Sequence, residues 1–183
     1  MSILRNNTFR KFVIKFILSF LLFYYGTILV ISLAAPSGIY SSFVHNYFDY
    51  VSWLKISLMN GASIVANLFG YQTKFEANYL VRIVNARGVY IAYDCVGYGV
   101  MSFWAAFTIA TEMKFSKKII WLFSGLLILW GINVFRIGLF LVSINKGWKM
   151  PLGIDHHTWF NIVAYLFIFI MIYFFNKNTE EKI

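Results

Sequence analysis

Long apolar segments separated by short polar ones dominate the sequence. The first covers about 12–35, and others cover about 95–113, 119–144 and 158–175. About 20 apolar residues suffice for a helix to cross a bilayer. The pattern therefore predicts an all-α polytopic membrane protein with about four transmembrane helices, in a single integral-membrane domain over 1–183.

The first apolar segment follows a basic stretch, and Ser32, Leu33 and Ala34 near its end resemble a signal-peptide cleavage site. The apolar core of a signal peptide covers about 7–15 residues, and this segment is longer. We therefore interpret it as an uncleaved anchor rather than a signal peptide.

Residues 36–94 mix charged and apolar positions, and we expect them to form an extracytoplasmic segment. Residues 50–70 predict an amphipathic helix in the membrane interface. Its apolar face would comprise Trp53, Leu54, Leu58, Ile64, Val65 and Leu68. A fifth span over the same residues is the alternative, but it would place Lys55, Asn60 and Asn67 in lipid.

Two stretches rich in β-forming residues, 79–84 and 88–92, flank the sequence Asn85-Ala86-Arg87-Gly88. This arrangement predicts a short β-hairpin with its turn at these four residues. We interpret the hairpin as a lid or as an edge strand that binds substrate.

Composition and charge support the membrane assignment. Apolar residues make up 60% and charged residues 13% of the chain, which excludes an ordinary soluble domain. The net charge is +9, but the basic residues cluster at the ends of apolar segments, so they indicate orientation rather than nucleic-acid binding. Their distribution predicts that both termini lie in the cytoplasm.

The predicted topology brings three reactive residue types to the outer side of the bilayer. Cys95 begins the second span, Arg136 lies in the third, and His156 and His157 begin the fourth. An arginine within a span usually faces a cavity, a polar partner or a ligand. Asn133 lies one helical turn from Arg136 and could hold the guanidinium or a substrate carbonyl.

These residues fit a thiol site for acyl transfer. A helix N-terminus and nearby positive charge stabilise a thiolate, and Gly97 would let a substrate backbone approach Cys95 closely. A histidine can deprotonate the thiol and later protonate a leaving amine, while an arginine can stabilise the oxyanion. Because Cys95 is the only cysteine, no disulfide, zinc cage or paired-thiol redox site can form. Two adjacent histidines cannot easily bind one ion, so we expect neither a metal nor another cofactor.

Three short motifs in this order resemble the exosortase/archaeosortase family. They are Cys-x-Gly at Cys95, Asn-x-x-Arg at Asn133 and Arg136, and a histidine that opens the last helix. In that family the histidine is often followed four residues later by glycine. The corresponding residue here is Phe160 for His156 and Asn161 for His157, and the small polar Asn161 favours His157.

The resemblance implies a transpeptidase of the bacterial cell membrane, in the family's small core form. Its substrates would be exported proteins that end in a short motif, a hydrophobic helix and a basic tail. The enzyme would cleave this sorting signal and transfer the protein to an acceptor glycan, lipid or water. Cys95 would be the nucleophile, Arg136 the oxyanion or substrate clamp, and His157 or His156 the acid and base.

Two other functions are compatible with the same residues. In a non-catalytic membrane scaffold or transporter subunit, Arg136 and Asn133 would form a hydrogen bond that packs helices. In a transferase that modifies a lipid or glycan, Arg136 would grip a phosphate.

Overall fold

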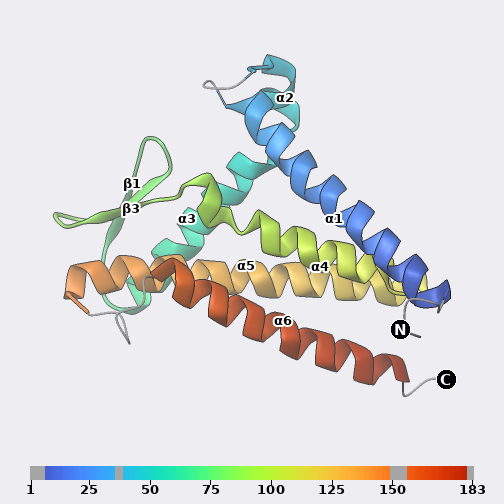
Figure 1. The fold of residues 1–183 in the computed structure, drawn as a ribbon. Helices are drawn as coiled ribbons and strands as arrows, with labels where there is room; N and C mark the ends of the chain where they lie inside the picture. Colours follow the sequence, from blue (N-terminus) through green and yellow to red (C-terminus); the bar gives the residue numbers. More distant parts are fainter. Residues whose placement is uncertain (1–6, 36–38, 149–155, 181–183) are drawn as a thin grey trace. The chain divides into compact units, whose positions relative to one another are not determined.

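The computed structural model describes residues 7–35, 39–148 and 156–180 (Figure 1). This part of the chain is mostly helical, with six α-helices, a 3-10 turn and a small antiparallel sheet. In chain order the elements are α1 (Asn7–Ala34), α2 (Ser42–Tyr47), α3 (Tyr50–Leu68), β1 (Thr73–Glu76), β2 (Leu80–Ile83), β3 (Gly88–Tyr90), η2 (Tyr93–Val96), α4 (Tyr98–Ala110), α5 (Phe115–Lys146) and α6 (His156–Glu180).

The chain divides into two compact units, and α5 and α6 each contribute a part to both. The first unit comprises Met1–Asp49, Tyr98–Ile128 and Ile168–Ile183. The second unit comprises Tyr50–Gly97 and Leu129–Phe167. The second unit holds the sheet, the 3-10 turn and the part of α5 that carries Asn133 and Arg136.

In the first unit, α1 and α4 lie side by side through aromatic side chains (Figure 1). Phe16 contacts Phe103 edge-on, with ring centroids 5.3 Å apart, and Tyr24 contacts Tyr98 at 5.4 Å. Gly99 lies against the Tyr24 ring, where a Cβ would make an ordinary packing contact at 3.5 Å. The aromatic residues of α1 thus form one face, which packs against α4.

The rest of α1 is apolar and exposed. Leu18, Leu22 and Leu29 are each more than half exposed, and only Thr27 and Ala34 of this helix are buried. Among the described residues, α1 and α5 are the two helices long and apolar enough to cross a bilayer. Exposure of these leucines of α1 to water would be unfavourable, whereas lipid would cover them without this cost.

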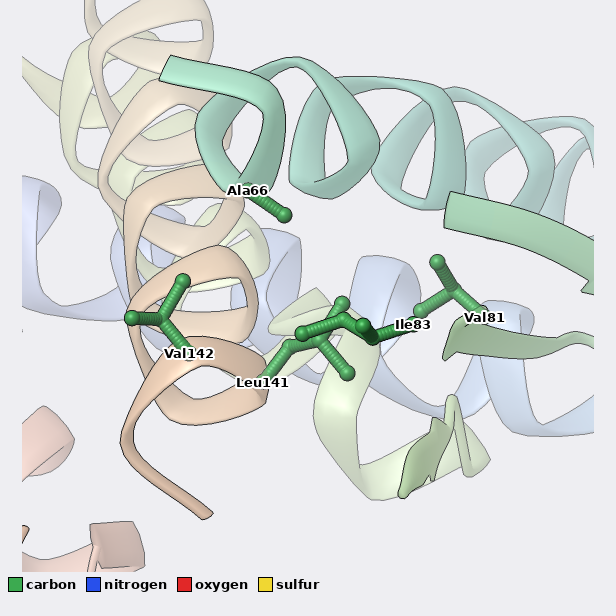
Figure 2. Close-up of a cluster of buried hydrophobic side chains, with 5 residues drawn as sticks. All are labelled: Ala66, Val81, Ile83, Leu141 and Val142. Atoms are coloured by element: carbon green, nitrogen blue, oxygen red, sulfur yellow. The ribbon is translucent and has the colours of Figure 1, made fainter. Parts of the chain in front are cut away.

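The core of the second unit forms where α3, β2 and α5 meet. Figure 2 shows side chains from these three elements directed into the same space. The cluster consists of Ala66, Val81, Ile83, Leu141 and Val142. Val81 and Ile83 of β2 are buried and alternate with the half-buried Leu80 and Arg82, so one face of the strand lies in the core.

Glycines allow α3 and α5 to approach each other closely in this unit. A Cβ at Gly61 of α3 would lie 2.6 Å from a methyl group of Val134, and a Cβ at Gly138 of α5 would lie 2.5 Å from Cβ of Val65. Both distances are shorter than packed carbon atoms tolerate. The helix contact therefore depends on a glycine opposite a valine at two places.

The sheet has the order β1-β2-β3, and both neighbouring pairs are antiparallel. The predicted hairpin is confirmed as β2 and β3, which the predicted turn joins. The preceding strand β1 was not predicted. It pairs with β2 from Thr73 opposite Ile83 to Glu76 opposite Leu80.

The predicted helix over 50–70 is confirmed as α3, but its predicted buried face is only partly correct. Leu58 and Val65 are buried, whereas Trp53 and Ile64 are more than 60% exposed. Leu54 is half-buried and Leu68 exposed. The buried face instead includes small residues and one lysine: Val51, Lys55, Leu58, Met59, Gly61, Ala62, Val65 and Ala66.

The expectation of a continuous helix over 95–113 is wrong. The helix α4 has 13 residues and is about 20 Å long, shorter than the hydrocarbon core of about 30 Å. Cys95 does not begin this helix, because it lies in η2 and Gly97 separates the two. Of the other three predicted segments, 12–35 corresponds to α1, and 119–144 and 158–175 fall within the longer helices α5 and α6.

Candidate functional site

A pocket in the second unit brings Cys95 and Arg136 together. Its volume is about 260 Å³. One wall is the chain that leaves the sheet and enters η2, and the other belongs to α5. The lining residues are Val89, Tyr90, Ile91, Ala92, Asp94, Cys95, Arg136, Ile137 and Phe140.

Cys95 is a free, half-buried cysteine in the 3-10 turn η2. Its backbone N–H donates to the carbonyl oxygen of Ala92 at 3.1 Å, which closes the turn. The guanidinium of Arg136 lines the same pocket and lies close enough to interact with the Cys95 side chain. A thiolate at this position would therefore have a cation beside it.

Asn133 connects the thiol turn to α5. Its side chain is 1% exposed, and its Nδ2 donates to the carbonyl oxygens of Cys95 at 2.8 Å and Val96 at 2.9 Å. Its Oδ1 accepts a longer hydrogen bond, 3.4 Å, from Nη1 of Arg136. One buried amide thus holds the backbone of the cysteine and contacts the arginine.

Gly97 ends the 3-10 turn in the left-handed conformation, with φ of 78°. A side chain would be strained at this φ, and a Cβ would lie 3.4 Å from Nδ2 of Asn133. The sequence predicted Gly97 as a place where substrate backbone approaches. That role stays a prediction, and the positive φ is what favours glycine at this position.

The predicted role of the histidine pair is not tested by the structure. His156 and His157 are the first two residues of α6, and their side chains lie outside the described part of the chain. Asn161 follows on the same helix and is exposed. Among the described residues, no group of three or more histidine, cysteine or carboxylate side chains could hold a metal ion.

A buried lysine among tyrosine rings in the second unit was not predicted from the sequence. Lys55 of α3 is 1% exposed, and its Nζ lies 3.3 Å from the ring centroid of Tyr93 and 4.7 Å from that of Tyr79. The Tyr79 hydroxyl donates to Oγ of Ser52 at 2.7 Å. The available signal was that Lys55 is the only charged residue of α3.

A second charged group lies on the sheet, outside the pocket. Oε1 of Glu76 is 3.0 Å from Nζ of Lys74 and 3.1 Å from Nε of Arg82. The Lys74 hydrogen bond and the charges of Arg82 and Lys74 lower the pKa of Glu76 below its ordinary value. Nη1 of Arg82 donates to the carbonyl oxygen of Ala86, so these charges stabilise the sheet and its turn.

Comparison of the chain with family models, curated proteins and solved structures finds no match. Its chemistry must therefore be argued from the pocket. A thiol beside a guanidinium, with its backbone fixed by a buried amide, is suited to nucleophilic attack on a carbonyl group. The guanidinium can stabilise the negative charge that develops on the attacked oxygen.

Proposed function

We propose that the chain is a membrane-embedded cysteine transpeptidase or protease of the exosortase type. It would cleave the C-terminal sorting signal of exported proteins and transfer them to an acceptor. The observation that carries this proposal is that Cys95 and Arg136 line one pocket, where their side chains interact electrostatically. The two residues come from different elements, a 3-10 turn and a long helix.

The first half of the proposed reaction forms a thioester. A histidine, His157 or His156, takes the proton of the Cys95 thiol, and the sulfur attacks the carbonyl carbon of the scissile peptide bond. The carbon–sulfur bond forms and the carbonyl oxygen becomes negative. When the intermediate collapses, the carbon–nitrogen bond breaks, and the histidine gives its proton to the leaving amine.

The second half releases the protein. An acceptor amine, hydroxyl or water attacks the thioester carbon, and the carbon–sulfur bond breaks. The proton lost by the acceptor returns to the sulfur through the same histidine, so the enzyme ends as it began. Arg136 stabilises the oxyanion in both halves, and Asn133 positions the thiol turn through its backbone hydrogen bonds.

We further propose a four-span topology in the bacterial inner membrane with both termini in the cytoplasm. The length and apolar character of α1 and α5 support two of the spans. The apolar stretches Tyr98–Ala110 and Asn161–Phe175 would be the two shorter membrane helices of this topology, and α4 by itself would cover about 20 Å of the bilayer. In this topology the thiol pocket faces the extracytoplasmic side, where exported substrates arrive.

Processing of an exported substrate in cells tests the proposal. The chain is produced together with an exported protein that carries a motif, a hydrophobic helix and a basic tail, encoded beside its gene. Cys95→Ala should abolish the loss of the tail, and Arg136→Gln should reduce its rate by about a hundredfold or more. The control is Val84→Ala, which changes an exposed residue outside the pocket lining.

The outcomes separate catalysis from folding. Each variant is quantified in the membrane fraction, and processing is divided by the amount of protein. Unchanged processing by Cys95→Ala would overturn the proposal. Comparison of His156→Gln with His157→Gln identifies the residue that acts as acid and base, because only replacement of the catalytic histidine should abolish thioester formation.

A non-catalytic scaffold is the second candidate, and one observation favours it. The buried Asn133 amide bonds to backbone carbonyls and contacts Arg136, as a helix-packing interaction would. This function predicts that Cys95→Ser is silent, while changes at Asn133 or Arg136 reduce the amount of protein in the membrane. Measurement of processing and abundance in the same variants distinguishes the two functions.

A further inference from the structure

The strand β3 forms an edge of the sheet and continues directly into the pocket wall. Among the described residues, β3 pairs with β2 and with no other strand. Four consecutive residues that begin in β3 line the pocket together with the thiol and the guanidinium: Val89, Tyr90, Ile91 and Ala92. The strand edge and the reactive sulfur thus belong to one cavity.

The pairing register identifies which backbone groups of β3 point away from β2. The N–H of Ile91 donates to the carbonyl oxygen of Tyr79, and the N–H of Ile83 donates to that of Arg87. In an antiparallel ladder, residues that bond to the partner strand alternate with residues whose groups point to the other side. The N–H and C=O of Tyr90 therefore point to the free edge, at the rim of the pocket.

We infer that the substrate binds as an extended peptide that adds a fourth strand to this edge at Tyr90, which brings its scissile carbonyl to Cys95. This inference rests on the proposed function and specifies the substrate class of the same site. An extended peptide presents N–H and C=O groups at the two-residue spacing that a strand edge matches. A helical segment cannot bind in this way, because its own turns already use these groups.

The position of the strand relative to the thiol also supports this occupant. The chain passes from Tyr90 to Cys95 within five positions, and the Cys95 N–H bonds back to Ala92, so edge and nucleophile are held in one short segment. At the other end of β3, the side chain of Asn145 donates to the carbonyl oxygen of Arg87 at 3.2 Å and accepts from its N–H at 2.8 Å. The edge is thus fixed at both ends.

A series of peptide probes, each N-methylated at a different amide, tests the inference on the natural chain. The probe is an N-acetylated four-alanine peptide, with four amide N–H groups, that carries a C-terminal vinyl sulfone, which adds irreversibly to a thiol. Four versions each carry one N-methylated amide. Because Cys95 is the only cysteine, the rate of adduct formation by the full chain in detergent can be followed by mass spectrometry of the intact protein.

The expected result is a loss of rate at one position of the peptide. Methylation of an amide that bonds to Tyr90 should slow labelling about tenfold, whereas methylation of its neighbours should change the rate less than about twofold. Equal rates for all four methylated probes and the parent would overturn the inference.

Iodoacetamide distinguishes failure of this inference from failure of the proposed function. This small reagent needs no strand edge, so its rate reports the thiol alone. If it labels the folded chain faster than the unfolded chain and the methylation series is flat, strand addition is wrong and the thiol site remains. If it labels the folded chain no faster than the unfolded chain, Cys95 is not activated and both proposals fall.

Discussion

The side-chain amide of Asn133 donates a hydrogen bond to the backbone carbonyl of Cys95, a residue 38 positions earlier in the chain. The bond is 2.8 Å long, and a second from the same nitrogen reaches Val96 at 2.9 Å. The partner of Asn133 is thus the turn that carries the thiol, rather than the thiol itself. Asn133 is a positioning residue in the proposed mechanism, and it contacts Arg136 as well.

Replacement of Asn133 should loosen this turn. Asn133→Ala leaves two buried carbonyl groups without their donor, so we expect the free energy of unfolding to fall by about 1–3 kcal/mol. Iodoacetamide labelling of Cys95 in the folded protein should slow severalfold, because the contact with Arg136 is no longer fixed. Unfolding in detergent followed by tryptophan fluorescence measures the first effect, and mass spectrometry measures the second.

Asn133→Asp provides the control for this prediction. It keeps the size of the side chain but replaces the donor by an oxygen, which cannot donate to a carbonyl when ionised. It should therefore be at least as harmful as Asn133→Ala. An aspartate variant with unchanged stability and labelling would show that the two carbonyl bonds do not hold the turn.

Gly97→Ala tests the left-handed end of η2. A residue with a Cβ pays about 1–2 kcal/mol in this conformation, and the new atom would lie 3.4 Å from Nδ2 of Asn133. We expect stability to fall by at least this amount. Gly131→Ala is the matched control, because a Cβ there meets nothing within 4 Å and alanine favours a helix. Equal effects of the two substitutions would contradict the role assigned to Gly97.

Lys55 should contribute to stability through the rings around it. Lys55→Ala removes the ammonium over Tyr93 and Tyr79 and leaves a cavity, so we expect a loss of about 2–4 kcal/mol. Lys55→Met retains most of the volume and should lose less. The measurement is chemical unfolding of both variants in the same detergent. A methionine variant more stable than the natural chain would show that the desolvation of the buried charge exceeds the stabilisation from its contacts with the rings.

The ion pairs of Glu76 predict a small dependence of stability on pH. Because the Lys74 hydrogen bond and the nearby positive charges lower the pKa of Glu76 in the folded chain, the folded state holds its proton less tightly than the unfolded state. The contribution is therefore complete above the unfolded pKa near 4.5 and is lost as the pH falls through the lower folded value. Glu76→Gln should remove this part of the acid dependence.

The size of this effect should be modest, since the Glu76 side chain is partly exposed and salt screens such pairs. The experiment compares unfolding of both proteins at pH 6 and pH 3, at low and at high salt. Two identical pH profiles at low salt would contradict the prediction.

The sequence predicted the elements whose signals are local. The helix over 50–70 and the turn at Asn85–Gly88 follow from short-range spacing and turn residues, and both are present. The strand β1 has no such signal, because Thr73–Glu76 becomes a strand through its pairing with β2. The buried face of α3 was misassigned because large apolar residues such as Trp53 are exposed in this chain, while Lys55 is buried.

In the site, too, some features could be predicted from the sequence and others depend on contacts between distant residues. The proximity of Cys95 and Arg136 could be anticipated from the order of apolar segments and loops. The partners of Asn133 could not, since backbone carbonyls are present at every residue and leave no mark in a sequence. The helix boundary at Tyr98 was also hidden, because Gly97 ends a turn whose conformation depends on contact with α5.

The reciprocal glycine and valine contacts between α3 and α5 have a consequence for how this chain can diverge. Gly61 meets Val134, and Gly138 meets Val65, so each helix supplies one small and one branched residue. A descendant that gains a side chain at 61 would survive only with a smaller one at 134, and the same holds for 138 with 65. Among homologues, these positions should covary in pairs, so that glycine can occupy either position of a pair.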